Sequence, residues 1–158
     1  MPLLQWLDEY EIGIPQADHE HLALINVINL LGDRLDARFG AEEIRQTLGE
    51  IRMLIAAHFG NEERIMRDLR YDQYAEHKAD HDRLLAEIAA IVVGFDRAAN
   101  QSAASQSGAN QSNAARNTPQ DWRVDLGGVV SRWFGRHFEK FDARLHILAD
   151  RPRAGMRE

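Results

Sequence analysis

The chain contains no cysteine, no excess of positive charge and no long apolar run. Without cysteine among its 158 residues, it can form no disulfide, no thiolate metal site and no iron–sulfur cluster. The formal net charge of −6, with no basic stripe, argues against a nucleic-acid binder. No run reaches membrane-spanning length, and the N-terminus carries acids where a signal peptide carries positive charge. We therefore expect one soluble cytoplasmic domain that neither binds nucleic acid nor inserts into a membrane.

Apolar side chains recur at helical spacing in four stretches of the chain. Ile44, Leu48, Ile51 and Ile55, for example, lie on one face of one helix. The first connections are only a few residues long, so successive helices should run antiparallel. The sequence predicts an all-α, up-down-up-down four-helix bundle. The expected helices span approximately residues 18–38, 41–69, 72–96 and 119–149.

Helix boundaries and two other segments complete the predicted domain, which spans residues 1–158. Asp18 and Asp72 are the expected N-caps of the first and third helices. Residues 1–17 carry too many apolar groups for a free tail, so we expect an ordered N-terminal arm packed on the bundle. Residues from about 98 to 117 are rich in Ala, Asn, Gln and Ser, have no apolar face and are typical of a flexible linker between the third and fourth helices.

Five histidines and two carboxylates lie on the predicted buried faces of the four helices. A single histidine in such a place is usually a packed core residue, and a His–Glu pair can simply share a hydrogen bond. A buried carboxylate, however, is unfavourable unless it is paired or bound to a cation. The joint pattern therefore predicts a metal site. Its candidate ligands are His21, His58, Glu62, His77, His81, His137 and Asp142.

The spacing of these residues differs between helices. His77 and His81 are four residues apart, as are His58 and Glu62, so each pair faces one way. His137 and Asp142 are five apart, and on an ideal helix their directions differ by about 140°. Asp142 is therefore the least secure candidate from periodicity alone. If both carboxylates and one oxide or hydroxide bridge the ions, the donors over-fill two tetrahedral zinc ions but leave one position open on two octahedral ions, which favours iron.

The motifs that carry these candidates resemble those of the hemerythrin family, in its single-domain bacterial form. The matching motifs are Trp6…Tyr10…Gly13, Asp18-His19-Glu20-His21, His58-Phe59-Gly60-Asn61-Glu62-Glu63, His77-x3-His81 and Trp133-x3-His137-x4-Asp142. This resemblance implies two iron ions joined by a bridging oxide or hydroxide, which bind dioxygen reversibly. It also implies that His77, His81 and His137 hold one iron and that His21 and His58 hold the other, which keeps the open position. Glu62 and Asp142 would bridge the two ions.

The expected oxygen pocket is apolar. Its candidate wall residues are Phe59, Trp133, Phe134 and Phe138, with Ile25, Ile28 or Ile55 nearby. These side chains offer no acid or base to a substrate, and a dry pocket slows proton delivery. The chain also lacks the Glu-x-x-His pairs of carboxylate-rich di-iron proteins. Phe134 stands where the family commonly carries leucine.

We therefore expect an oxygen carrier, storage or delivery protein that is not an enzyme. Two other interpretations remain open. One is an oxygen or redox sensor that signals to a partner, and the other is a di-iron peroxidase or nitric-oxide-handling enzyme. Dioxygen is the expected ligand, an oxygen-consuming enzyme is a candidate partner, and the expected oligomeric state is a monomer.

Overall fold

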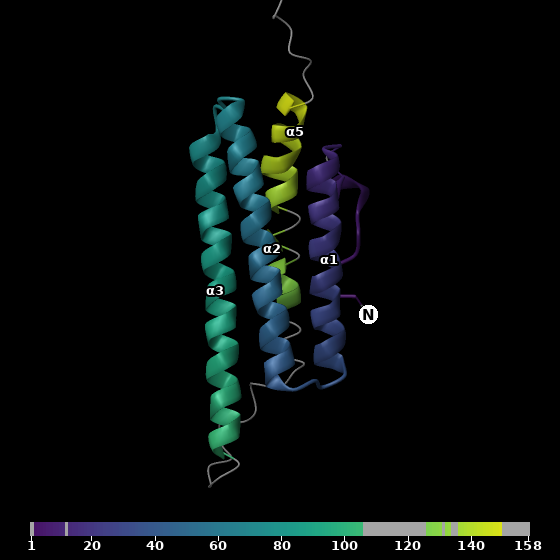
Figure 1. Ribbon diagram of the computed structural model, residues 1–158, viewed down its shortest axis with the longest axis vertical. Helices are drawn as coiled ribbons and strands as arrows, with labels where there is room; N and C mark the ends of the chain where they lie inside the picture. Colours follow the sequence, from purple (N-terminus) through teal and green to yellow (C-terminus); the bar gives the residue numbers. More distant parts are fainter. Residues whose placement is uncertain (1, 12, 106–125, 131, 134–135, 150–158) are drawn as a thin grey trace, which may run out of the picture.

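The chain folds into a bundle of helices. The computed structural model describes residues 2–11, 13–105, 126–130, 132–133 and 136–149, and all regular structure in these residues is helical. Three long helices pack side by side and antiparallel: α1 (Pro15–Asp36), α2 (Ala41–Asp68) and α3 (Tyr74–Ser105) (Figure 1). The fourth helical segment consists of the helical residues 126–130, 132–133 and 136–137, with η3 (Phe138–Asp142) and α5 (Ala143–Ala149). The predicted all-α four-helix bundle is confirmed.

The first helix starts earlier than its sequence predicts. Pro15 occupies its first turn and Ile14 is the capping residue, so the prediction that Asp18 caps the helix is wrong. A proline fits the first turn because its φ angle is already helical and its missing N–H has no partner there. Asp18 instead accepts a hydrogen bond from the backbone N–H of Gly13 at 3.1 Å, and Gly13 has a φ of 78°.

The third helix differs from its prediction at both ends. It begins at Tyr74, and Asp72, the expected cap, forms an ion pair with Arg144 at 3.0 Å. It continues to Ser105, so residues 98–105, which the sequence assigned to a flexible linker, are helical. Four alanines in this stretch favour the helix because alanine has the highest helix propensity. The rest of the predicted linker lies outside the described residues.

An N-terminal arm packs along α1 (Figure 1). The backbone N–H and carbonyl of Leu4 each make a 2.9 Å hydrogen bond to the side-chain amide of Asn29. The short helix η1 (Asp8–Tyr10) follows, and Tyr10 is buried with its ring edge-on to Trp6. These contacts hold the backbone of Tyr10 against the inside of the bundle.

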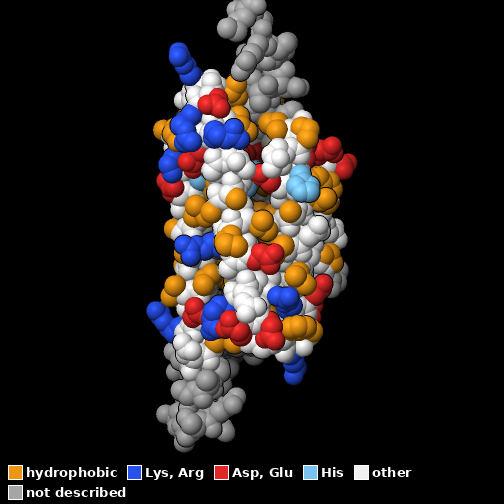
Figure 2. All heavy atoms as spheres, viewed as in Figure 1, with side chains coloured by type: hydrophobic (Ala, Val, Ile, Leu, Met, Phe, Trp, Pro, Cys, Tyr) orange, Lys and Arg blue, Asp and Glu red, His pale blue; other side chains and the backbone are white. Residues whose placement is uncertain are grey.

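Two apolar clusters fill the core, and the candidate ligands lie between them. The larger cluster holds Ile28 and Ile55, among other side chains, and the smaller one consists of Met66, Tyr71 and Leu145. The outer surface mixes apolar, acidic and basic side chains, as the face in Figure 2 shows. None of the described helices is both long and apolar enough to cross a membrane.

Candidate metal centre

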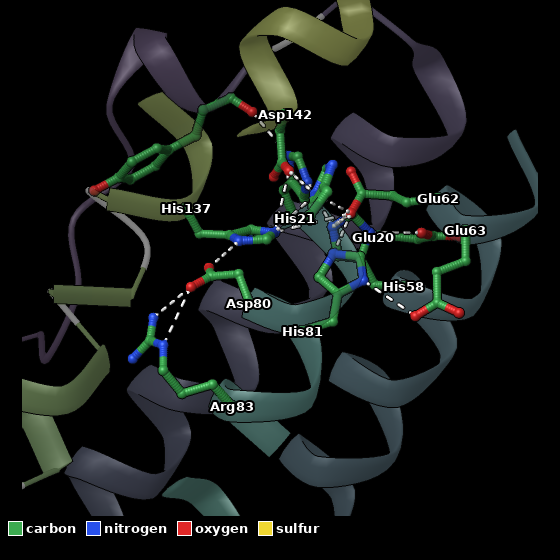
Figure 3. Close-up of polar contacts among 12 residues, drawn as sticks. Glu20, His21, His58, Glu62, Glu63, Asp80, His81, Arg83, His137 and Asp142 are labelled. Atoms are coloured by element: carbon green, nitrogen blue, oxygen red, sulfur yellow. Dashed lines mark hydrogen bonds and ion pairs between the residues drawn. The ribbon is translucent and has the colours of Figure 1, made fainter. Parts of the chain in front are cut away.

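All seven candidate ligands lie close together inside the bundle. Figure 3 labels all of them except His77. Each of the four helical segments contributes at least one of them, and none is more than 2% exposed. They form two groups in which the possible ligand atoms lie within 4.8 Å of one another. The first group is Glu62, His77, His81 and His137. The second group is His21, His58 and Asp142.

The two carboxylates lie between the groups. Glu62 Oε2 is 3.1 Å from His81 Nε2 and 3.6 Å from His58 Nε2, so it faces histidines of both groups. Asp142 belongs to the second group, yet its Oδ1 lies 3.2 Å from His77 Nε2 and 3.1 Å from His137 Nε2 in the first. A carboxylate in such a position can place one oxygen on each of two cations.

A π-helical turn explains how Asp142 reaches the centre. Residues Phe138–Asp142 form η3, and the backbone N–H of Ala143 donates to the carbonyl of Phe138, five residues earlier. This turn is wider than that of an α-helix, so His137 and Asp142 face the same side although they are five residues apart. Single π turns inside α-helices occur frequently at functional sites. The ideal-helix argument against Asp142 therefore does not apply to this segment.

Several buried polar atoms in the centre have no hydrogen-bond partner among the described residues. They are Glu62 Oε1, both carboxylate oxygens of Asp142 and His77 Nδ1. Burying a carboxylate oxygen without a donor or a cation is strongly unfavourable. The donor set therefore fits metal ions, since cations would satisfy these oxygens and the imidazole nitrogens beside them.

Four of the five histidines are oriented by a hydrogen bond from Nδ1. His21 donates to the backbone carbonyl of Tyr10 at 2.9 Å. In the other three, Nδ1 faces a carboxylate oxygen. The distances are 2.9 Å from His58 to Glu20, 3.3 Å from His81 to Glu63 and 2.8 Å from His137 to Asp80. Such a bond fixes the proton on Nδ1, turns the Nε2 lone pair towards the centre and strengthens it as a ligand.

Each acceptor belongs to the element that precedes its histidine in the chain. An acceptor in the arm binds the histidine of α1, one in α1 binds a histidine of α2, one in α2 binds a histidine of α3, and one in α3 binds the histidine of the fourth segment. Helical periodicity assigned no role to Glu20, Glu63 and Asp80. Their signal was their position, because each is the immediate neighbour in sequence of a candidate ligand. Which histidine each one holds depends on how the helices are rotated against one another.

The electrostatics of the centre favour ionised carboxylates. Burial alone would raise the pKa of Asp142, but the charge of His137 and the nearby ring nitrogens of His137 and His77 hold this pKa well below its usual value. Burial and the loss of favourable hydration lower the pKa of His21 to about 4, with a further contribution from His58. Burial would also raise the pKa of Asp80, but hydrogen bonds from His137 and Arg83 lower it to about 2. The carboxylates of the centre are therefore ionised at neutral pH.

Comparison with known proteins agrees with this geometry. The family model of the hemerythrin HHE cation binding domain matches residues 13–147. The chain belongs to the hemerythrin family. The resemblance predicted from the sequence motifs is thereby confirmed. The matched region includes all seven candidate ligands of this hemerythrin centre.

Individual relatives are distant in sequence. The bacteriohemerythrin of Pseudomonas paraeruginosa (strain PA7) is 27% identical over 143 residues, which cover 90% of this chain and 79% of the relative. That of Clostridium acetobutylicum is 28% identical over 86 residues, or 52% of this chain and 67% of the relative. The crystal structure of a leucine-to-phenylalanine mutant matches with a TM-score of 0.70 at 25% identity and covers 94% of this chain and 98% of its own. The crystal structure of a leucine-to-tyrosine mutant of hemerythrin has the same TM-score at 24% identity and the same coverage of both chains, which supports the fold.

Aromatic side chains surround the hemerythrin centre. The ring of Phe59 stacks on the His81 ring with 3.8 Å between the ring centroids, and the Phe138 ring lies edge-on to the His21 ring with a centroid distance of 4.1 Å. The Trp133 ring lies edge-on to that of Phe59 with a centroid distance of 5.8 Å. These three of the four expected pocket residues are buried beside the candidate ligands, whereas Phe134 lies outside the described residues.

A small apolar cavity lies next to this wall. Its volume is about 20 Å³, and Ile55 and Trp133 are among its exclusively apolar lining residues. An apolar cavity of this kind stays dry because it offers a water molecule no polar partner. Ile25 and Ile28, the other expected neighbours of the pocket, are buried in the larger apolar cluster of the core, which also contains Ile55.

Proposed function

We propose that this chain binds dioxygen reversibly at a non-haem di-iron centre, as a carrier, storage or delivery protein. The observation that carries the proposal is the division of the ligands into two unequal groups that share two carboxylates. Three imidazoles face one side and two face the other. Two octahedral ions bridged by both carboxylates and one oxide or hydroxide would then keep one open position, on the two-imidazole side.

The roles of the ligands follow from these groups. His77, His81 and His137 would hold one iron, and His21 and His58 would hold the other. Glu62 and Asp142 would bridge them, since each faces histidines of both groups. When bound, the iron pair supplies the two electrons that reversible dioxygen binding uses.

The surroundings favour binding over turnover. Phe59, Trp133 and Phe138 exclude water from the centre, and a dry site slows the delivery of protons to a bound ligand. Glu20, Glu63 and Asp80 carry charge close by, but each is already engaged with a histidine Nδ1. This arrangement supports a carrier rather than an acid–base catalyst. The shared name of the relatives, bacteriohemerythrin, agrees with that interpretation.

The decisive experiment measures metal content and the visible spectrum together. The purified protein should contain about two irons per chain. An absorption band should appear on exposure of the reduced protein to air, disappear when oxygen is removed, and return over several cycles. One stoichiometric zinc, or no metal after iron-replete expression, would contradict the di-iron centre. Continuous oxygen consumption with a mild reductant would show that the protein is an enzyme instead.

A further inference from the structure

A second site is formed by an open groove between α3 and the fourth helical segment. Its volume is about 450 Å³, which is within the range of small-molecule binding sites. Arg83 and Glu87 lie on the α3 side, and Arg132, Trp133 and Arg136 lie on the other. None of its described lining residues is a candidate metal ligand, and the groove shares Leu84, Ile91, Val129 and Trp133 with the small apolar cavity described above.

The charge of the groove is positive, in contrast to the chain as a whole. Among the described residues, three arginines line it and Glu87 is the one acidic lining residue. Arg83 is paired with Glu87 at 2.6 Å and with Asp80 at 2.6 Å. Among the described residues, no carboxylate lies within ion-pair distance of Arg132 or Arg136, and both are exposed. Within the part of the chain that the structure describes, two guanidinium groups thus line the groove without a carboxylate partner, and guanidinium binds carboxylates and phosphates with paired hydrogen bonds.

The remaining lining residues are apolar. Ala90, Ile91 and Val129 keep part of their surface exposed, whereas Leu84 and Trp133 are buried. A simple inorganic ion would leave the three exposed apolar side chains uncovered, whereas an organic body would cover them and gain from the burial of apolar surface. The arginines suit an acidic group and the apolar side chains suit a flat apolar body, so the groove fits a ligand that carries both.

We propose that this groove binds an organic anion, namely a carboxylate or phosphate attached to an apolar ring system. Arg132 and Arg136 bind the anionic oxygens, and Ala90, Ile91 and Val129 contact the ring. The guanidinium group of Arg83 can also contact the ligand, but it already forms ion pairs with Asp80 and Glu87.

The groove is connected to the metal centre through Arg83. Its guanidinium donates to Asp80, and Asp80 in turn accepts the Nδ1–H of His137 at 2.8 Å (Figure 3). An anion that draws Arg83 away leaves Asp80 a stronger acceptor for His137. By thermodynamic linkage, a ligand in the groove and the state of the centre then influence each other. This connection rests on the proposed di-iron function, whereas binding in the groove does not.

The binding test uses four probes that separate the ring from the charge. By isothermal titration of the purified protein, 1-naphthyl phosphate or 1-naphthoate should bind at one site per chain, and whichever binds more tightly identifies the acidic group. 1-Naphthol, which has the ring without the acidic group, and inorganic phosphate, which has the acidic group without the ring, should each bind about tenfold more weakly. Equal binding of 1-naphthol and both anionic naphthalenes, or no saturable binding of either anion, would overturn the proposal.

Variants then locate the site. Arg132→Gln and Arg136→Gln should each weaken binding of the better probe about tenfold. Glu87→Gln should strengthen it about threefold, because it releases Arg83 and removes a negative charge. Arg52→Gln is the matched control, since Arg52 is an exposed arginine of α2 outside the groove. If both groove variants bind like the parent, the probe does not occupy this groove and the proposal is wrong.

The connection is tested in the iron-loaded protein. Saturation with the probe should shift the visible absorption band of the parent and leave the band of Arg83→Gln unchanged, with the probe still bound. A bound probe that does not move the parent spectrum would overturn the connection. A protein that binds the probe but holds no iron would instead contradict the proposed function.

Discussion

The two halves of the metal centre are built from different parts of the chain. The three-imidazole half takes its histidines from α3 and the fourth helical segment, with carboxylates of α2 and α3 behind two of them. The two-imidazole half depends on α1 and on the N-terminal arm, because the carbonyl of Tyr10 orients His21. The half that would keep the open iron position is thus supported in part by a short segment outside the bundle. The coordination number would thus be lower on the side that the N-terminal arm supports.

The largest effect should come from Glu62, which both halves share. Glu62→Ala removes a donor to both ions and leaves buried histidines without their counter-charge, so we expect loss of the paired centre. The free energy of unfolding should fall by roughly 3 kcal/mol or more, since metal binding and folding are linked. Iron analysis and thermal unfolding measure this. Glu50→Ala is the control, because Glu50 is exposed on the same helix. A Glu62→Ala protein with full iron and the parent spectrum would refute the bridging role.

Removing one histidine from each half tests their inequality directly. His21→Ala leaves a single imidazole on its side, so this variant should hold about one iron per chain. His77→Ala leaves two imidazoles on its side and should retain more metal than His21→Ala. Iron per chain, measured after dialysis against a weak chelator, gives the comparison. The same iron content in both variants would show that the halves are equivalent.

A smaller effect is expected from the outer carboxylates. Asp80→Asn keeps the shape of the side chain but removes the charge that accepts the Nδ1–H of His137. The loss of such an oriented acceptor typically weakens metal binding about 10- to 100-fold. Metal competition with a chelator measures the affinity. Asp82→Asn, which alters an exposed carboxylate paired with Lys78 on the same helix, should have parent affinity. If the two variants behave alike, Asp80 does not support the centre.

The smallest effect should follow from loosening the arm. Asn29→Ala removes two hydrogen bonds that hold Leu4 on α1, at a cost of about 1–2 kcal/mol. Because the same arm carries Tyr10, the two-imidazole half should release its iron faster, while the other half is unaffected. Hydrogen exchange of the arm and the kinetics of iron release test this. An unchanged release of both irons would separate the arm from the centre.

Helical periodicity predicted the fold class and the seven residues that lie together in the centre, because buried faces recur at a fixed spacing. It failed where a local feature overrides that spacing. The proline-led start of α1 and the alanine-rich extension of α3 depend on propensities of single residues. The π turn at Phe138–Asp142 breaks the helical period itself, so an ideal helix placed Asp142 on the wrong side.

The roles of Glu20, Glu63 and Asp80 could not be predicted in the same way. Each carboxylate lies beside a candidate ligand of its own helix but contacts a histidine of the next helix. Sequence spacing describes one helix at a time. The rotation of one helix against another, which decides these pairs, is set by packing of the whole core.

The ordered pairing of acceptors and histidines also bears on how the chain is made. In every pair the acceptor comes first in the chain: Tyr10 before His21, Glu20 before His58, Glu63 before His81, and Asp80 before His137. A ribosome releases the N-terminal part first. Each of these four histidines therefore emerges after the group that will orient it has been synthesised. The last helical segment, which brings both His137 and Asp142, completes the ligand set only when the rest of the bundle has already been synthesised.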